Sequence, residues 1–497
     1  MVKLRAAATL AVAVALCGLT LVAVHSGIRH RYGLSDLLVL GALWVAFAGG
    51  ALLVRRVRVR LAAAVILAGG AGMQVAALTA PPHTSDDVYR YVWDGRVQAA
   101  GLDPYRYVPA APELTNLRDR FLWRPDSHWC LPPGTLDPDR SGVTLVPGCT
   151  KINRPAVHTV YPPAAEAYFA AVDAASPAGA GTLPMQAGAA TSAVAVTVLL
   201  LGGLRRLDRD PRLAVLWAWC PTVTLEAGNG AHVDVLAVAF TAAALLILSG
   251  PRTRRRSLGE SLLGGGLLGF AVATKLYPAL TASAVLRRRP VAVLSAAVAA
   301  VIAVYLPHLL AVGGRVVGYL PGYLREEGYS TGGRFALLRL ILPEAWCGPV
   351  AAAILAATTL AVLRFDRPDR PWDGALVMTG TALILTSPTY PWYAELVVLL
   401  AALAARPEWL PLAWAGYLPL FGRTAGLSWS QGTVVGYATA AAAVVIATLA
   451  RATLARRASG PPRAAVPAPV APQSQPCSLL ASREEAVPSG RRRTAMP

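Results

Sequence analysis

The sequence predicts an all-α polytopic membrane protein. Of its 497 residues, 55% are hydrophobic and only 15% charged, and its mean hydropathy is +0.48. Apolar runs of about 20 residues recur along the chain, as spanning the hydrocarbon core of a bilayer requires. The net charge of +19 is typical of nucleic-acid binding in a soluble chain. Here the Arg residues stand in short clusters between apolar runs, which instead indicates membrane orientation.

We expect about 11 to 14 crossings, because some of the shorter runs are half-helices broken at Pro278, Pro391 and Pro407. The first run follows a short basic start and lacks a small-x-small cleavage site, so it is predicted to be a retained anchor. The apolar runs are 6–24, 36–54, 61–80, 186–204, 212–227, 231–249, 259–274, 276–286, 290–311, 346–364, 373–388, 391–405, 408–421 and 432–450.

Three regions follow from this pattern. Residues 1–60 would be N-terminal anchor spans, and residues 61–458 the main transmembrane domain, with a large polar loop at 81–160. Residues 459–497 are rich in Pro, Ala and Arg. Such a segment cannot bury a core, so we expect a disordered cytoplasmic tail.

Basic clusters set the expected orientation, because loops rich in Lys and Arg stay in the cytoplasm. This rule puts both termini inside and the polar segments 81–160, 228–232, 312–334 and 387–392 outside. The outer segments are the ones richest in acidic, His, Tyr and Trp residues. The clusters assigned to the inside are 55–60, 205–212, 252–256, 287–289 and 451–457.

The acidic pair Asp86-Asp87 opens the first polar loop, directly after the run 61–80. A carboxylate at the outer end of a span can act as a general base toward an acceptor hydroxyl. Its acidic neighbour would raise its pKa, because like charges disfavour double ionisation. The alternative is structural, with Ser85 or Asp86 capping a surface helix that starts near Val88.

Arg90, Arg96, Lys275 and Arg334 are candidate ligands for a phosphate, since Arg offers a planar fork and Lys a point charge. Lys275 follows a long weakly polar run and precedes a helix-breaking Tyr-Pro. A buried Lys needs an anion, either a protein carboxylate or a lipid phosphate. Alternatively, Lys275 snorkels to the membrane interface.

Two further polar segments are candidates for sugar binding. Glu226, His232 and Asp234 bracket a Gly-Asn-Gly turn, which is either a sugar-binding turn or a turn solvated by water. His and Asp two residues apart do not face the same way on a helix, so a metal site is not predicted. The segment 387–393 combines Tyr390 and Trp392 with prolines, which suggests either an interfacial aromatic belt or a stacking platform. The loop containing Glu326, Glu327 and Arg334 is either a lid over the donor or a linker.

No phosphate-binding loop or dinucleotide fingerprint occurs in the sequence. The run Gly264-Gly265-Gly266 lies inside an apolar span, where small residues serve helix packing. We therefore expect any sugar donor to be linked to a lipid rather than to a nucleotide. Cys130 and Cys149 lie in the outer loop and are candidates for a disulfide, because an oxidising compartment permits one.

Several motifs, in this order, resemble those of glycosyltransferases with the GT-C fold, and most closely glycosyltransferase family 87, the polyprenyl-phosphate-mannose-dependent mannosyltransferases of actinobacteria. The resemblance extends over roughly residues 35 to 450. The motifs are Asp87-Val88-Tyr89-Arg90-Tyr91, Trp93-Asp94-Gly95-Arg96-Val97, Gly101-Leu102-Asp103-Pro104-Tyr105, Tyr161-Pro162-Pro163, the segment 228–234, Ala273-Thr274-Lys275-Leu276-Tyr277-Pro278 and Tyr390-Pro391-Trp392-Tyr393.

The resemblance implies a GT-C-type helical bundle whose first large extracytoplasmic loop is catalytic. A sugar, usually mannose, would pass with inversion from a polyprenyl phosphate to a glycolipid or glycan hydroxyl at the outer face of the plasma membrane. The catalytic carboxylate maps onto Asp87 or Asp86, of which Asp87 directly precedes the Val-Tyr pair. No cofactor and no metal is implied. The residues then expected to contact sugar or acceptor are Tyr89, Trp93, Asp94, His232, Asp234, Tyr390 and Trp392.

A transporter or flippase that moves a lipid-linked sugar without reacting it is the alternative from another class, since it also needs broken helices and buried charge. Internal repeats would favour the transporter, and the sequence has none of fixed period. The large polar loop with acidic and aromatic residues favours the enzyme.

Overall fold

A computed structural model describes residues 2–26, 33–123, 150–250 and 256–458 of the chain. These residues are helical apart from turns and loops, and one isolated antiparallel bridge joins Trp123 to Thr150. The predicted all-α class is therefore confirmed. The first helices in chain order are α1 (Val2–Ser26), α2 (Leu34–Val54), α3 (Val59–Ala77), α4 (Asp87–Ala99), η1 (Pro112–Leu117), α5 (Pro163–Ala174) and α6 (Leu183–Arg206).

The remainder of the chain alternates long helices with short broken ones. The elements that follow α6 are η3 (Pro211–Ala214), α7 (Val215–Ala218), α8 (Pro221–Val223), η4 (Thr224–Asn229), α9 (Asp234–Leu248), α10 (Leu258–Thr274), η5 (Tyr277–Thr281), α11 (Ala282–Val285), α12 (Pro290–Val312), η6 (Gly313–Val317), α13 (Leu320–Glu326), η7 (Leu338–Leu340), α14 (Glu344–Phe365), α15 (Pro371–Thr386), η8 (Pro391–Ala394), α16 (Glu395–Ala404), η9 (Pro407–Trp409), α17 (Pro411–Ala415), α18 (Leu418–Phe421), η10 (Gly422–Ala425) and α19 (Trp429–Ala458).

Within the described ranges, seven helices are long and apolar enough to cross a membrane. The described ranges also contain three shorter apolar helices of 10 to 17 residues. The count is lower than the predicted 11 to 14 crossings, because several apolar runs fold as short segments instead of single helices. The seven are Leu4–Ser26, Leu34–Val54, Val59–Ala77, Leu183–Arg206, Pro290–Glu326, Glu344–Phe365 and Trp429–Leu454.

Prolines mark where the broken segments begin, as the sequence predicts. Pro278 stands in the first turn of η5, and Pro391 and Pro407 are the first residues of η8 and η9. Proline is tolerated there because the first turn of a helix leaves its N–H groups unpaired in any case. The apolar runs at 276–286 and 408–421 are therefore divided into short helices whose ends can present polar groups.

Helix α10 packs against α9 and α12 through its glycines. A Cβ atom at Gly265 would lie 2.3 Å from the Val293 carbonyl oxygen, and one at Gly269 would lie 2.3 Å from that of Ala297. At Gly266, on another face of the helix, nothing lies within 4 Å. The predicted packing role of this glycine run therefore holds for Gly265 but not for Gly266.

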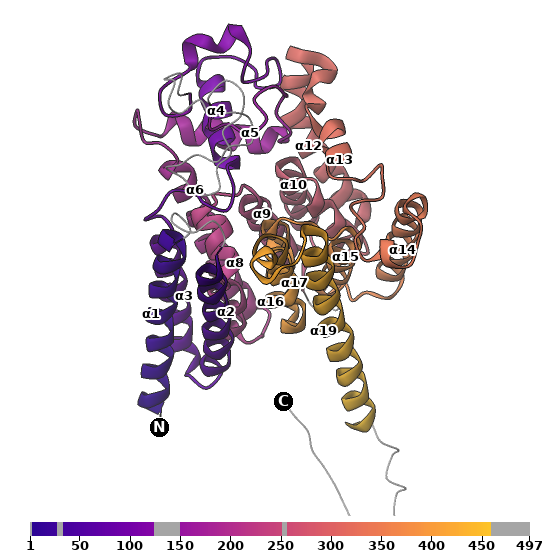
Figure 1. The fold of residues 1–497 in the computed structure, drawn as a ribbon. Helices are drawn as coiled ribbons and strands as arrows, with labels where there is room; N and C mark the ends of the chain where they lie inside the picture. Colours follow the sequence, from indigo (N-terminus) through magenta and orange to yellow (C-terminus); the bar gives the residue numbers. More distant parts are fainter. Residues whose placement is uncertain (1, 27–32, 124–149, 251–255, 459–497) are drawn as a thin grey trace, which may run out of the picture. The chain divides into compact units, whose positions relative to one another are not determined.

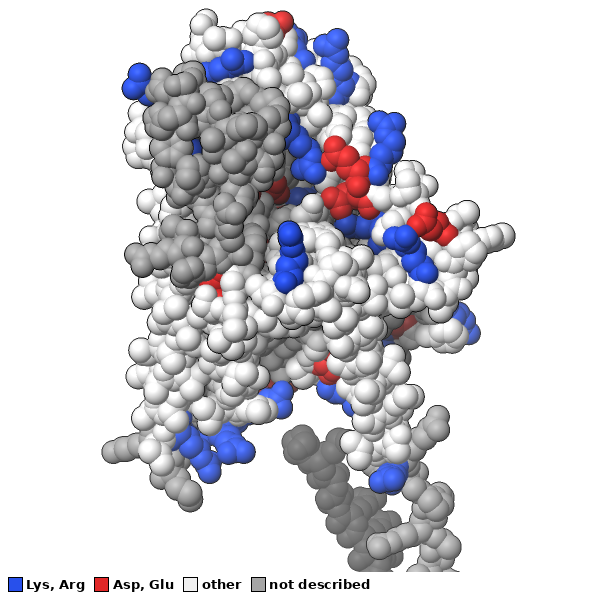
Figure 2. Space-filling model, viewed as in Figure 1, with Lys and Arg blue, Asp and Glu red and all other residues white. Residues whose placement is uncertain are grey.

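The described residues up to Ala447 form one compact unit, and those from Thr448 onward belong to a second. In the first unit, α1 and α2 pack on each other, and α1 also packs on α3. Helices α4 and α5 lie side by side (Figure 1). Few acidic side chains reach the face seen in Figure 2, and most of them gather beside basic ones. The predicted boundaries at residues 60 and 458 remain predictions.

Candidate functional site

Five ionisable side chains from four separate segments form one charged cluster in the first unit. Asp87 begins α4, Glu226 and His232 come from η4 and the turn after it, Asp234 begins α9, and Lys275 follows α10. Distances of 3.2 to 3.9 Å between ionisable side-chain atoms connect the members in two groups, Asp87–His232–Glu226 and Asp234–Lys275. The Asp87 carboxylate also lies within electrostatic reach of the Lys275 ammonium group, so the two groups form one cluster.

The Gly-Asn-Gly turn fixes the middle of this cluster. The Asn229 side-chain amide donates hydrogen bonds to the carbonyls of Ala77, Ala80 and Pro81 at 3.1 to 3.2 Å. A Cβ atom at Gly228 would lie 2.8 Å from the Ala77 Cβ atom, so only glycine allows this approach to α3. The turn is therefore locked to the end of α3, immediately before the acidic pair.

Asp86 and Asp87 stand at the start of α4, where their main chain is also held. The Asp87 N–H donates to Ser85 Oγ at 3.1 Å, and Asp86, the N-cap residue of α4, makes no side-chain capping bond, so both carboxylates are left for other contacts. Burial, followed by the charge of Asp87, raises the pKa of Asp86 from 3.8 to about 6. The predicted repulsion within the pair is therefore present, but it acts on Asp86.

His232 lies between two carboxylates. Its Nδ1 is 3.9 Å from Asp87 Oδ2, and its Nε2 is 3.4 Å from Glu226 Oε2. The Tyr417 hydroxyl donates to Glu226 Oε1 at 2.6 Å, and the imidazole stacks on Trp392 with 3.8 Å between ring centroids. These contacts bury His232 completely, and its role in binding sugar remains a prediction.

Lys275 and Asp234 form the second group. The Lys275 ammonium lies 3.2 Å from Asp234 Oδ2, and over the rings of Tyr161 at 5.1 Å and Tyr393 at 5.9 Å. A buried Lys is expected to have an anionic partner, and the Asp234 carboxylate is such a partner. Aromatic faces on two sides add cation–π attraction to the ion pair.

Exposure separates the members of the cluster that a substrate can touch from those that it cannot. The side chains of Asp87 and Lys275 are 19% and 15% exposed, whereas those of Glu226, His232 and Asp234 are fully buried. One carboxylate and one ammonium group therefore face the accessible side of the cluster.

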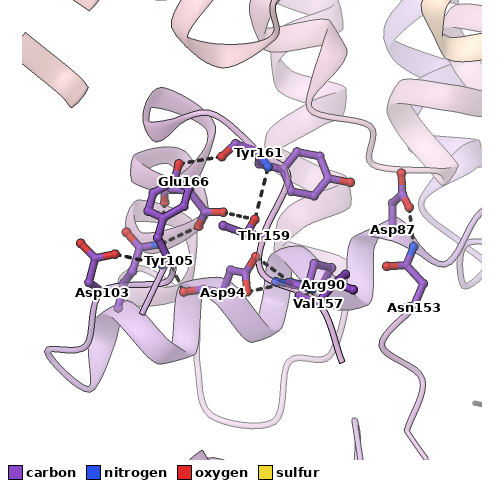
Figure 3. A network of polar contacts seen from close by, with 11 residues as sticks. Asp87, Arg90, Asp94, Asp103, Tyr105, Asn153, Val157, Thr159, Tyr161 and Glu166 are labelled. Atoms are coloured by element: carbon purple, nitrogen blue, oxygen red, sulfur yellow. Dashed lines mark hydrogen bonds and ion pairs between the residues drawn. The ribbon is translucent and has the colours of Figure 1, made fainter. Parts of the chain in front are cut away.

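Arg90 and Asp94 lie one turn further along α4 and neutralise each other. The Arg90 Nε is 2.9 Å from both Asp94 oxygens, and Arg90 also donates to the Val157 carbonyl at 3.2 Å (Figure 3). Glu166 lies beside Asp94 and accepts a hydrogen bond from the Thr159 hydroxyl at 2.7 Å. Burial, and then the charge of Asp94, raises the pKa of Glu166 well above its usual range. This network holds α4, α5 and the segment between them together.

The other candidates on α4 are also engaged in packing. Arg96 pairs with Asp119 at 2.8 Å, and Trp93 packs edge-on against Trp123 with 5.5 Å between centroids. Tyr89 is buried. These contacts explain why the motif residues occur here, and binding roles for them remain predictions.

Arg334 and Tyr390 line an open cavity of about 950 Å³, which also contains Glu326, Glu327 and Trp429 in its wall. Arg334 is paired with Glu327. Tyr390 stacks on Trp392 with 4.7 Å between centroids, so a continuous aromatic stack leads from this cavity to His232. Within the described ranges, no three His, Cys, Asp or Glu side chains are grouped so as to hold a metal ion.

Two residues of the site carried no recognisable signal in the sequence. Asn153 binds both Asp86 and Asp87, and Tyr417, which binds Glu226, comes from a run that reads as purely apolar. Each binds a residue that lies at least 66 positions away in the sequence, and such separations follow no repeating spacing. The candidate disulfide residues Cys130 and Cys149 lie outside the described residues.

The fold and the cluster define a polytopic membrane protein with an ionisable site at the ends of its helices. Residues 159–388 match the profile of glycosyltransferase family 87. The match supports a membrane glycosyltransferase, as the motifs predict. The matched segment contains His232, Asp234 and Lys275, whereas the acidic pair precedes it.

Among solved structures, the chain is similar to an oligosaccharyltransferase of Archaeoglobus fulgidus, crystallised with zinc and sulfate, at 16% sequence identity and a TM-score of 0.29. The alignment covers 77% of this chain, which spans about half (49%) of the length of that enzyme. No curated protein matches the sequence.

Proposed function

We propose that this glycosyltransferase transfers a sugar, mannose in the first instance, from a polyprenyl phosphate to a hydroxyl group of a glycolipid or glycan. The transfer takes place at the extracytoplasmic face of the plasma membrane and inverts the anomeric centre. The observation that supports this proposal is the pair of accessible charges, Asp87 and Lys275, in front of a fully buried set of supporting groups.

Asp87 acts as the general base in this proposal. It takes the proton of the acceptor hydroxyl while the oxygen attacks the anomeric carbon of the donor. The bond between that carbon and the phosphate oxygen breaks, and the polyprenyl phosphate leaves with the electron pair. His232, held by Glu226 and by the Trp392 ring, fixes the orientation of the Asp87 carboxylate.

Lys275 stabilises the leaving phosphate. Negative charge grows on the phosphate as the bond breaks, and a cation already in position lowers the barrier without reorganisation. Arg90 is less suited to this task, since its guanidinium is buried in the pair with Asp94. Arg334 faces the 950 Å³ cavity, and we assign it to the lipid side of the donor.

The test uses membranes or purified protein, radiolabelled polyprenyl-phosphate mannose and a glycolipid extract as acceptor. Asp87→Asn should lower the rate by about 10²- to 10⁴-fold, because that is the usual contribution of a general base. Asp86→Asn is the matched control and should retain most of the activity. The reverse result would make Asp86 the base, and full activity in both variants would remove the pair from the mechanism. Movement of the donor across the bilayer without transfer would favour the flippase.

A further inference from the structure

Asn153 connects the two carboxylates of the acidic pair. Its side-chain amide nitrogen donates to Asp87 Oδ1 at 2.6 Å and to Asp86 Oδ1 at 2.9 Å. Figure 3 shows the carboxamide directed at Asp87 from a loop segment. An amide group has two N–H bonds, so one hydrogen serves each carboxylate.

The backbone on both sides of Asn153 is anchored, which fixes the position of the carboxamide. Before it, the Thr150 hydroxyl and the Lys151 N–H both donate to the Leu122 carbonyl at 2.9 Å. After it, Arg154 pairs with Glu326 at 2.9 Å and adopts a left-handed backbone conformation with φ +49°. A non-glycine residue is strained in that conformation and persists only where its surroundings hold it. These anchored neighbours therefore hold the Asn153 amide next to the acidic pair.

Besides Asn153, both charged and phenolic side chains face the pair. Arg154 acts on both carboxylates through its charge. His232 and Lys275 face Asp87 from the turn after η4 and from the end of α10. Tyr91, Tyr161 and Tyr390 also lie close enough to interact with the Asp87 charge.

We propose that Asn153 is a positioning residue of the transfer reaction, which binds Asp86 and Asp87 together and leaves Asp87 Oδ2 as the oxygen that accepts the proton. The inference rests on the proposed function of Asp87 as base. Hydrogen bonds to the charged form of a carboxylate favour that form. The Asn153 hydrogen bond therefore favours the ionised form of Asp86, whose pKa burial and the charge of Asp87 raise to about 6.

The experiment compares the pH dependence of kcat and KM in the wild type, Asn153→Ala and Asn153→Asp between pH 5 and 9. Without the amide, protonation of the pair becomes easier, so the acid limb should move up by about one pH unit. On that limb Asn153→Ala should then lose about tenfold more activity than at pH 8.5. Asn153→Asp should shift the limb further, since it adds a third carboxylate. Asn116→Ala, in the same polar loop at an exposed position, is the matched control and should behave as the wild type.

A merely structural role predicts a loss that is equal at all pH values, and an unshifted acid limb would overturn the proposal. If Asn153→Ala does not fold, Asn153→Ser keeps one donor and should show a smaller shift. Infrared titration of the carboxyl bands, assigned with Asp86→Asn and Asp87→Asn, gives the same comparison without any substrate. An inactive wild type with every polyprenyl-phosphate sugar would refute the proposed function, whereas an unmoved carboxyl titration in Asn153→Ala would refute this inference alone.

Discussion

The ion pair between Lys275 and Asp234 offers a direct test of what the ammonium group does. Asp234 is fully buried, so Lys275→Met leaves a buried carboxylate without its cation. At the observed 3.2 Å, an effective dielectric constant of about 20 gives an attraction on the order of 5 kcal/mol. Breaking a buried pair from one side usually costs about 3–5 kcal/mol. We expect Lys275→Met to be destabilised by an amount in that range.

The double variant Lys275→Met/Asp234→Asn separates stability from donor binding. It removes both charges, so most of the lost stability should return. If Lys275 also binds the donor phosphate, the double variant should still show a raised KM for the polyprenyl-phosphate donor. Thermal unfolding in detergent measures stability, and the dependence of transfer rate on donor concentration measures binding. Lys275→Arg retains the charge and serves as the control.

Two outcomes would refute this reasoning. Recovery of both stability and donor KM in the double variant would mean that Lys275 is only the counterion of Asp234. Unchanged stability and donor KM in Lys275→Met would mean that the ammonium group is solvated at the interface, as in the snorkelling alternative.

Two further predictions concern stability. Burial raises the pKa of Asp86 to about 6 from its ordinary 3.8, so the folded protein binds that proton more tightly than the unfolded chain. The free energy of unfolding should therefore fall as the pH rises from 4 to 6, with the full penalty present above pH 6. Asp86→Asn should lack this fall in thermal unfolding at pH 4, 6 and 8, and an identical pH profile in variant and wild type would contradict the assignment. Gly265→Ala and Gly269→Ala should each destabilise the protein by about 1–3 kcal/mol, because a Cβ atom there meets a carbonyl of α12 at 2.3 Å. Gly266→Ala has open space and should be neutral; equal losses at all three positions would contradict the steric argument.

Part of the site was predictable from local sequence. The acidic pair stands where an apolar helix ends, and Lys275 follows an apolar helix with no neighbouring acid in the sequence. Both are charged groups beside apolar helices, and the structure places Asp87 and Lys275 in the charged cluster. Arg90 and Asp94 show the limit of this approach. Their spacing of four on one helix matches an ion pair, yet the motif context favoured binding roles for both.

The remainder of the site depends on contacts between distant segments. His232 reaches Asp87 because η4 packs on α3, and Tyr417 reaches Glu226 because η4 and α18 share a hydrophobic cluster. Asn153 lies in a polar stretch with no periodicity, so nothing local distinguishes it from an ordinary loop residue. Hydrogen-bond partners of this kind have no fixed sequence spacing, whereas helix periodicity does.

By itself, the sequence determined the all-helical membrane class, the breaks at the prolines and the chemical identity of the charged residues. Composition and proline geometry act locally, so they can be read without a structure. Tertiary structure alone decided which charges neutralise each other and which stay accessible. Burial is a property of packing between segments, and it left Asp87 and Lys275 partly exposed while it enclosed Glu226, His232 and Asp234.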